Sequence, residues 1–231
     1  MRALIITLLV IIFTFGISVD LKANILPEDC IVINIPSRTL DLYRKGTLKK
    51  TYPVGVGRAQ FPTPVGKFKV ITMVKQPGWE NPYKPFGYSR INAGSANPLG
   101  TRWIGFKEDS GGEYGIHGTD NPQSVGKFSS HGCVRMLVKD AEDLFINIKM
   151  HMPVIVTYDT VRVFKKDSEV FLKTFPDTYK KGISDINTVK QNIKAISNHV
   201  LWNASVALES LKAPTNQPVK IGTIIDETDF Y

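Results

Sequence analysis

Alternating apolar and polar residues dominate the chain from Cys30 to about Asp159. Near the start of this stretch, the alternate residues Ile31, Ile33 and Ile35 are apolar. A two-residue period is typical of a half-buried β-strand, and glycine, proline and asparagine separate the runs. Further runs of this kind cover residues 40–43, 52–56, 68–71 and 153–159. The pattern predicts a mainly β fold of the sandwich or barrel-like type.

One segment in this β-rich region has a helical period instead. Residues 139–150 carry apolar side chains three or four positions apart, at Ala141, Leu144, Phe145 and Ile148. That spacing puts the four side chains on one face of a helix. We therefore expect one or two helices within the β unit, this segment among them.

The chain after residue 159 begins with a second β pattern. Val161–Phe164 and Val170–Thr174 alternate as strands do, and charged residues 165–167 lie between them. Two strands joined by a short polar segment predict a β-hairpin. Residues 219–225 have the composition of one further strand.

Between these strands the apolar residues take a helical spacing over a long stretch. From Ile186 to Leu211 they recur every three or four positions, with Asp185 before the first and Pro214 after the last. These boundaries predict one long amphipathic helix. We expect it to pack on the β unit, together with the rest of residues 159–231. The alternative is that its apolar face binds a partner.

The first two dozen residues differ in kind from the rest. A short basic start precedes an almost unbroken apolar run from Ala3 to Ile17. This length fits the hydrophobic segment of a secretory signal peptide and is short for a membrane-spanning helix. Cleavage after Ala23 would make residues 1–23 a signal peptide, and an uncleaved N-terminal membrane anchor is the alternative. Both interpretations place the remaining residues outside the cytoplasm.

The chain is basic, with a formal net charge of +8. A basic exported protein is attracted to anionic surfaces such as membrane headgroups and wall polymers. Nucleic acid lies in the wrong compartment, and the sequence has no dense arginine stripe and no interleaving of basic and aromatic residues. We therefore exclude nucleic acid as a partner.

The two cysteines, Cys30 and Cys133, allow two interpretations. A pair of cysteines in an exported protein usually forms a disulfide. Alternatively, Cys133 is a reactive thiol, and Cys30, at the start of the first predicted strand, is a small buried residue. We favour the second interpretation because of the residues around Cys133.

The segment from Tyr114 to Met136 contains Cys133 and two of the four histidines, His117 and His131. A cysteine thiolate attacks a carbonyl carbon when a base is nearby and hydrogen-bond donors stabilise the oxyanion. Either histidine can be the base, because imidazole titrates near neutrality. On an extended strand, His131 would lie about 6–7 Å from Cys133, which is too far for direct proton transfer, although a turn at Gly132 could shorten this distance.

His117 can reach Cys133 only if neighbouring strands bring the two together. Gly118, next to His117, leaves an accessible backbone carbonyl that can hold the second ring nitrogen, as the third member of a triad does. The backbone amides of Gly132 and Cys133 are the expected oxyanion donors, because glycine permits close approach and unusual dihedral angles.

Two other interpretations of these residues stay open at this point. His117, His131 and Cys133 would supply three ligands, as in a catalytic zinc site, although no second short-range pair of ligands accompanies them. The same side chains can also have purely structural roles. Residue types alone do not decide between catalysis, metal binding and structure.

The order of the residues resembles the signature of the L,D-transpeptidases, the YkuD-type catalytic domain family. That signature has a histidine, a spacer, and then Ser/Thr-His-Gly-Cys followed by an apolar residue and Arg or Asn. The matching positions here are His117, Ser130, His131, Gly132, Cys133, Val134 and Arg135. Segments 52–58, 61–70 and 97–100 also resemble family segments. The similarity marks residues 29–158 as a catalytic domain, and residues 159–231 resemble a C-terminal extension of one branch.

The resemblance implies a cysteine acyltransferase of peptidoglycan biosynthesis, with roles in cell wall organisation and cell shape, in the periplasm or cell envelope. Such enzymes cleave a stem tetrapeptide after its third residue, release D-alanine and hold the acyl group as a thioester. An amine accepts it: another stem peptide in a 3→3 cross-link, a free D-amino acid, or an outer-membrane lipoprotein. Water as acceptor gives a carboxypeptidase, or a hydrolase that removes wall-attached lipoprotein.

The resemblance also implies roles for individual residues. Cys133 is the nucleophile, His117 is the base and later the acid, and the Gly118 carbonyl orients His117. Arg135 binds a stem-peptide carboxylate or braces its loop. The pocket and its oxyanion site are formed by Gly132, Ser130 and His131. The resemblance implies no metal or other cofactor. It also implies that carbapenems acylate the protein. A catalytically silent wall-binding module is the alternative outside enzymology.

Overall fold

The computed structural model describes residues 26–80, 90–94, 96–182 and 184–225. The predicted signal peptide or anchor over residues 1–23 lies outside this part of the chain. No helix among the described residues is long and apolar enough to span a membrane.

A five-stranded sheet is built from the first alternating segments of the sequence. Alternate residues of its central strand, Ile31 and Ile33, are fully buried, as the two-residue period predicts. The first strand pairs in parallel with a strand 123 residues later, so Ile31 lies opposite Val154. The strand order is β3 (Thr47–Pro53), β2 (Thr39–Arg44), β1 (Cys30–Asn34), β13 (Pro153–Thr157) and β5 (Gly66–Lys69).

A second, four-stranded sheet comes from the middle of the chain. Its order is β12 (Val134–Arg135), β10 (Gly112–His117), β9 (Arg102–Asp109) and β6 (Thr72–Lys75). Two short strand pairs flank it: β4 (Val56–Gly57) with β11 (Phe128–Ser130), and β7 (Trp79–Glu80) with β8 (Arg90–Ile91). A 3-10 turn, η1 (Pro122–Ser124), precedes β11.

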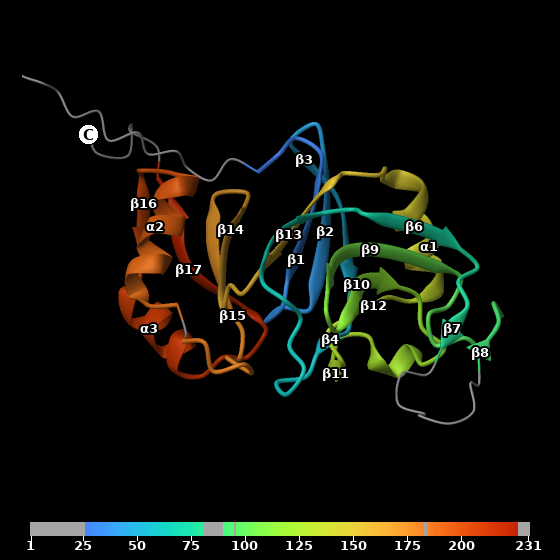
Figure 1. The fold of residues 1–231 in the computed structure, drawn as a ribbon. Coiled ribbons are helices and arrows are strands. Elements are labelled where there is room, and N and C mark those ends of the chain that lie inside the picture. The colour runs from blue at the N-terminus through green and yellow to red at the C-terminus, as the bar shows by residue number, and fades with distance from the viewer. Residues whose placement is uncertain (1–25, 81–89, 95, 183, 226–231) are drawn as a thin grey trace, which may run out of the picture.

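Helix α1 (Val138–Asn147) lies beside the second sheet (Figure 1). The main hydrophobic core contains residues of both sheets and of this helix. The helix overlaps the predicted segment 139–150, begins one residue before it and ends three residues before its end. It buries Ala141, Leu144 and Phe145 on one face. The mainly β fold predicted from the sequence is therefore confirmed, and its strands come from segments far apart in the chain.

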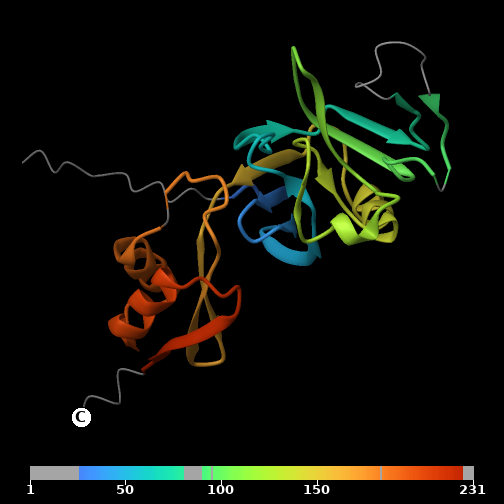
Figure 2. The same ribbon diagram turned by 90° about the horizontal axis from the view of Figure 1, so that it is seen from below.

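The C-terminal residues form a separate sheet with two helices on one face. Its strand order is β14 (Val161–Lys166), β15 (Glu169–Thr174), β17 (Pro218–Ile224) and β16 (Val200–Trp202). The first two strands form the hairpin that the alternating pattern predicts. The helices lie on the side of this sheet that faces away from the larger β unit (Figures 1 and 2). They cover a second hydrophobic core, made of residues after Thr160.

The prediction of one long helix over residues 186–211 is wrong. The structure has two helices, α2 (Ile186–Ile196) and α3 (Ala204–Lys212), with β16 between them. Asn203 starts a new helix because its side chain accepts hydrogen bonds from the amides of Ser205 and Val206, as a helix N-cap does. The apolar spacing continues across the break because Val200, on β16, packs against the same core.

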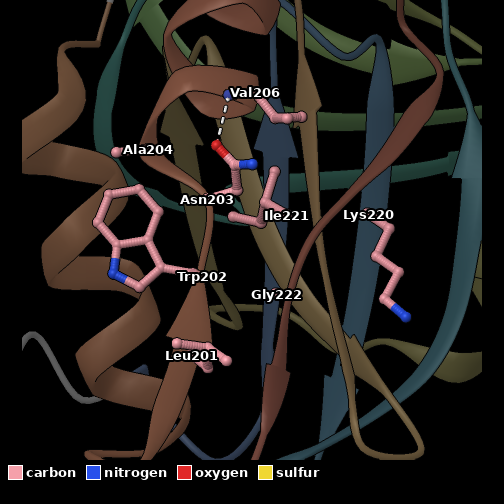
Figure 3. Close-up of a pocket in the computed structure, with 8 residues that line it drawn as sticks. All are labelled: Leu201, Trp202, Asn203, Ala204, Val206, Lys220, Ile221 and Gly222. Carbon is pink, nitrogen blue, oxygen red and sulfur yellow. Dashed lines mark hydrogen bonds between the residues drawn. The ribbon is translucent and has the colours of Figure 1, made fainter.

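A groove of about 620 Å³ lies between β16, β17 and the start of α3 (Figure 3). Leu201, Trp202, Val206 and Ile221 line it, and Leu201 is 70% exposed. The residues that line this groove include no histidine and no cysteine, so it contains none of the residues predicted for catalysis.

Candidate active site

The pairing of β10 with β12 brings the predicted catalytic residues together. The two strands run parallel, with Ile116 opposite Val134 and His117 opposite Arg135. Ile116 and Val134 are fully buried in the core, so the next residue on each strand points to the opposite face. Cys133 directly precedes Val134 and lines the same cleft as His117. The strand register thus brings His117 and Cys133, which are 16 residues apart in sequence, to one cleft.

His117, Cys133 and Arg135 line a cleft of about 270 Å³. It is partly enclosed by Trp79, Pro98 and Leu99. The polar and reactive residues that line it are Glu113, His117, Ser130, His131, Cys133 and Arg135. Glu113 was not predicted from the sequence, because no motif marks it.

His117 is buried, and its imidazole is held in the neutral form. Its side chain is 4% exposed, and Nδ1 lies 2.5 Å from the Gly118 carbonyl oxygen. A carbonyl only accepts hydrogen bonds, so Nδ1 carries the proton and Nε2 is left as an acceptor. Burial lowers the pKa of His117 to about 4; the Gly118 hydrogen bond opposes this, and the charge of Arg135 adds to it.

The Trp103 indole packs against the imidazole of His117. It lies opposite His117 on β9, and the two rings stack with centroids 5.6 Å apart at an angle of 22°. A Cβ atom at Gly115 would lie 2.5 Å from the Trp103 ring. Gly115 therefore leaves the space that the indole occupies beside His117. Sequence reasoning missed both residues, because their contact depends on strand register.

Cys133 is a free thiol in a partly buried position. Burial raises its pKa, whereas a hydrogen bond from the Gly115 backbone and the charge of Arg135 lower it. The negative charge of Glu113 raises the pKa further. The net effect is upward, so the thiol is protonated at neutral pH and needs a base to become nucleophilic.

The Ser130 hydroxyl closes the loop that precedes Cys133. This hydroxyl donates a hydrogen bond to the Cys133 carbonyl at 2.5 Å and accepts one from the Gly132 amide at 3.1 Å. Gly132 has φ +115°, and a Cβ there would lie 2.7 Å from the Tyr114 ring, so only glycine fits. The Gly132 amide is thus directed to Ser130, which leaves the Cys133 amide as the better candidate oxyanion donor.

His131 lines the cleft and contacts residues of a loop that is distant in sequence. Its Nε2 contacts the Arg58 guanidinium, and its ring centroid lies 4.8 Å from that of Phe61. Burial and the charges of Arg58 and Arg135 lower its pKa. Arg58 and Phe61 were not predicted as site residues, although they lie in segments that carry the family resemblance.

The sequence also raised the possibilities of a metal site and of a Cys30–Cys133 disulfide. Among the described residues, no group of three or more His, Cys, Asp or Glu side chains is placed to hold a metal ion. Cys30 is fully buried in strand β1 and free. A Cys30–Cys133 disulfide is therefore not formed, and Cys30 belongs to the core.

Comparison with known proteins gives consistent results for the β-rich part of the chain. A family model described as the L,D-transpeptidase catalytic domain matches residues 28–156. YqjB of Bacillus subtilis (strain 168), which carries an L,D-transpeptidase name, is 38% identical over 143 residues, covering 60% of this chain and 77% of that protein.

Two further comparisons are more distant. YbiS of Escherichia coli (strain K12), which also carries an L,D-transpeptidase name, is 33% identical over 135 residues, covering 52% of this chain and 43% of that protein. The solved structure of an L,D-transpeptidase from Mycobacterium smegmatis is 21% identical, with a TM-score of 0.45, and covers 56% of this chain and 58% of that one.

Proposed function

Because the chain belongs to the L,D-transpeptidase family, we propose that it is an exported cysteine acyltransferase that acts on peptidoglycan stem peptides. The observation that supports this proposal is a cleft lined by both the buried His117 and the free thiol of Cys133. The proposed location is the periplasm or cell envelope, with residues 1–23 as signal peptide or anchor.

In the proposed acylation step, Nε2 of His117 takes the proton of the Cys133 thiol. The sulfur then attacks the carbonyl carbon of the third stem-peptide residue. The Cys133 amide stabilises the oxyanion of the tetrahedral intermediate. When the C–N bond breaks, His117 returns the proton to the departing D-alanine amine, and a thioester is left on the sulfur.

In the proposed second step, an amine attacks the thioester carbon while His117 accepts the amine's proton. Collapse of the intermediate forms the new amide and releases the thiolate, which regains its proton. Arg135, on the same face as His117, is suited to bind a stem-peptide carboxylate. The acceptor in this proposal is another stem peptide, a D-amino acid or an envelope lipoprotein, and water would give hydrolysis instead.

The test is to incubate the purified protein with a disaccharide-tetrapeptide and identify the products by mass spectrometry. We expect loss of D-alanine with formation of a cross-linked dimer, or exchange when a D-amino acid is added. Cys133→Ala should abolish both products, because no thioester can form. Cys30→Ala is the matched control and should keep them, since Cys30 is buried in the core.

The same experiment separates the remaining alternatives. Tripeptide without dimer or exchange identifies a hydrolase that uses the same site. A carbapenem should add its mass to wild type and to Cys30→Ala, but not to Cys133→Ala. A catalytically silent wall-binding module is the conclusion if wild type and Cys133→Ala give identical product and adduct spectra.

A further inference from the structure

Tyr179, in the C-terminal part of the chain, contacts a loop close to the active site. Its hydroxyl donates a hydrogen bond to the Gly57 carbonyl at 2.6 Å and accepts one from the Thr63 amide at 3.2 Å. Gly57 and Thr63 are the two ends of the loop 57–63. Tyr179 lies beyond the residues that the family model matches.

Tyr179 is itself held firmly in place. Its ring stacks on Tyr158 with centroids 5.3 Å apart, and it meets Phe128 edge-on at 5.9 Å. Its amide donates to the Tyr158 hydroxyl at 2.7 Å, and that hydroxyl donates to Asp177 at 2.7 Å. A side chain fixed by packing and by hydrogen-bonded neighbours presents its hydroxyl in one position.

The loop 57–63 is closed at its base, where Tyr179 binds. The Gly57 amide donates to the Thr63 hydroxyl at 2.9 Å, and Thr63 is buried. A Cβ at Gly57 would lie 2.3 Å from the Phe61 carbonyl oxygen, so the loop folds tightly over this glycine. Contacts at the base therefore constrain the whole loop.

Residues between the two ends of this loop contact the catalytic segment. Arg58 contacts His131 Nε2, and the Arg58 amide donates to the Ser130 carbonyl at 3.1 Å. The Phe61 ring packs on the His131 ring, and the Arg58 guanidinium lies 4.8 Å over the Phe61 ring. The position of the loop thus affects where His131 lies, two residues before Cys133.

We propose that Tyr179 is a positioning residue through which the C-terminal segment holds loop 57–63 against His131 and shapes the cleft for its donor. The identity of the donor as a stem peptide rests on the proposed function. Because Tyr179 acts on the loop and not on the proton transfer at His117, its loss affects donor binding more than the chemical step.

The first test is the substitution Tyr179→Phe, which keeps the ring and removes the hydroxyl. We expect the KM for the tetrapeptide to rise roughly 5- to 20-fold, with kcat within about 2-fold of wild type. The matched control is Tyr52→Phe. The Tyr52 hydroxyl donates a hydrogen bond at 2.7 Å to Asp143, which lies on helix α1. Tyr52→Phe therefore loses a comparable hydrogen bond outside the loop 57–63 and should keep the KM of wild type.

The second test needs no turnover and follows the His131 ring by NMR titration, assigned with a His131→Gln spectrum. Burial, Arg58 and Arg135 lower the pKa of His131. Release of the loop should raise this pKa in Tyr179→Phe and leave it unchanged in Tyr52→Phe. The variants' thermal stability, measured in parallel, separates a local effect from general loosening.

The positioning role is overturned if Tyr179→Phe matches wild type in both KM and the His131 titration. It is also overturned if both tyrosine variants change KM and kcat equally and in proportion to lost stability. If wild type shows no turnover but the His131 titration shifts only in Tyr179→Phe, the proposed function fails and the positioning role stands.

Discussion

The two faces of the sheet β12-β10-β9-β6 differ in what their side chains do. On one face, Ile116 and Val134 are fully buried in the main core. On the other face, the very next residues, His117 and Arg135, line the cleft. The same two strands therefore supply both packing and chemistry, and one residue step separates them because strand side chains alternate in direction.

The difference between the faces extends to their smallest residues. The core face is filled by large apolar side chains, whereas the cleft face has glycine at positions 105 and 115. A Cβ at Gly105 would lie 1.5 Å from a Glu113 carboxylate oxygen, and one at Gly115 would clash with Trp103. On the cleft face, the missing side chains make room for neighbours that shape the site.

The largest expected effect is on the cleft face, at His117. We expect His117→Gln to lower kcat/KM for the tetrapeptide by roughly 10²- to 10⁴-fold, because a general base is lost from the reaction. His131→Gln is the comparison and should raise KM while keeping most of kcat. Steady-state kinetics measures both. A loss below about tenfold in His117→Gln would show that another group is the base.

Substitutions on the core face should lower the stability of the fold rather than the catalytic rate. Ile116→Ala leaves a cavity in a fully packed region and should lower the free energy of unfolding by about 2–5 kcal/mol. The kcat of the folded fraction should stay near that of wild type. Ile146, 74% exposed on α1, gives the control variant Ile146→Ala, with little change expected. Urea denaturation and active-site titration with a carbapenem measure the two quantities.

The third expected effect is a pH dependence of stability from His117. Its pKa is about 4 in the folded state, against 6.5 for an ordinary histidine. The unfolded chain therefore binds a proton at a higher pH than the folded chain. The contribution of the neutral imidazole to the free energy of unfolding is fully present above pH 6.5. It decreases by about 3 kcal/mol as the pH falls from 6.5 toward 4.

This dependence is measured by urea denaturation at pH 7 and pH 4.5 in wild type and His117→Gln. Other groups titrate in both proteins, so the difference between the two isolates His117. The free energy of unfolding should fall further in wild type than in the variant. Equal decreases in both would mean that His117 is not a buried, neutral base.

Much of the β unit could be predicted from local patterns. The alternating runs at residues 30–35 and 153–159 became β1 and β13, and the helical spacing after Lys139 became α1. The long C-terminal helix was predicted wrongly, because Val200 keeps the apolar spacing while it lies on a strand. A three-to-four-residue period records which side chains are buried, and it does not record whether the backbone between them stays helical.

The side chains available for chemistry could be identified from the residues alone, because His117, Ser130, His131 and Cys133 stand in a recognisable order. Which of them come together depends on the tertiary fold. The pairing of β10 with β12 brings His117 into the cleft that also contains Cys133 and His131. The tertiary fold also brings Tyr179 to the loop that contacts His131. Local periodicity follows from side-chain direction within one strand, whereas register and loop contacts depend on segments far apart in the chain.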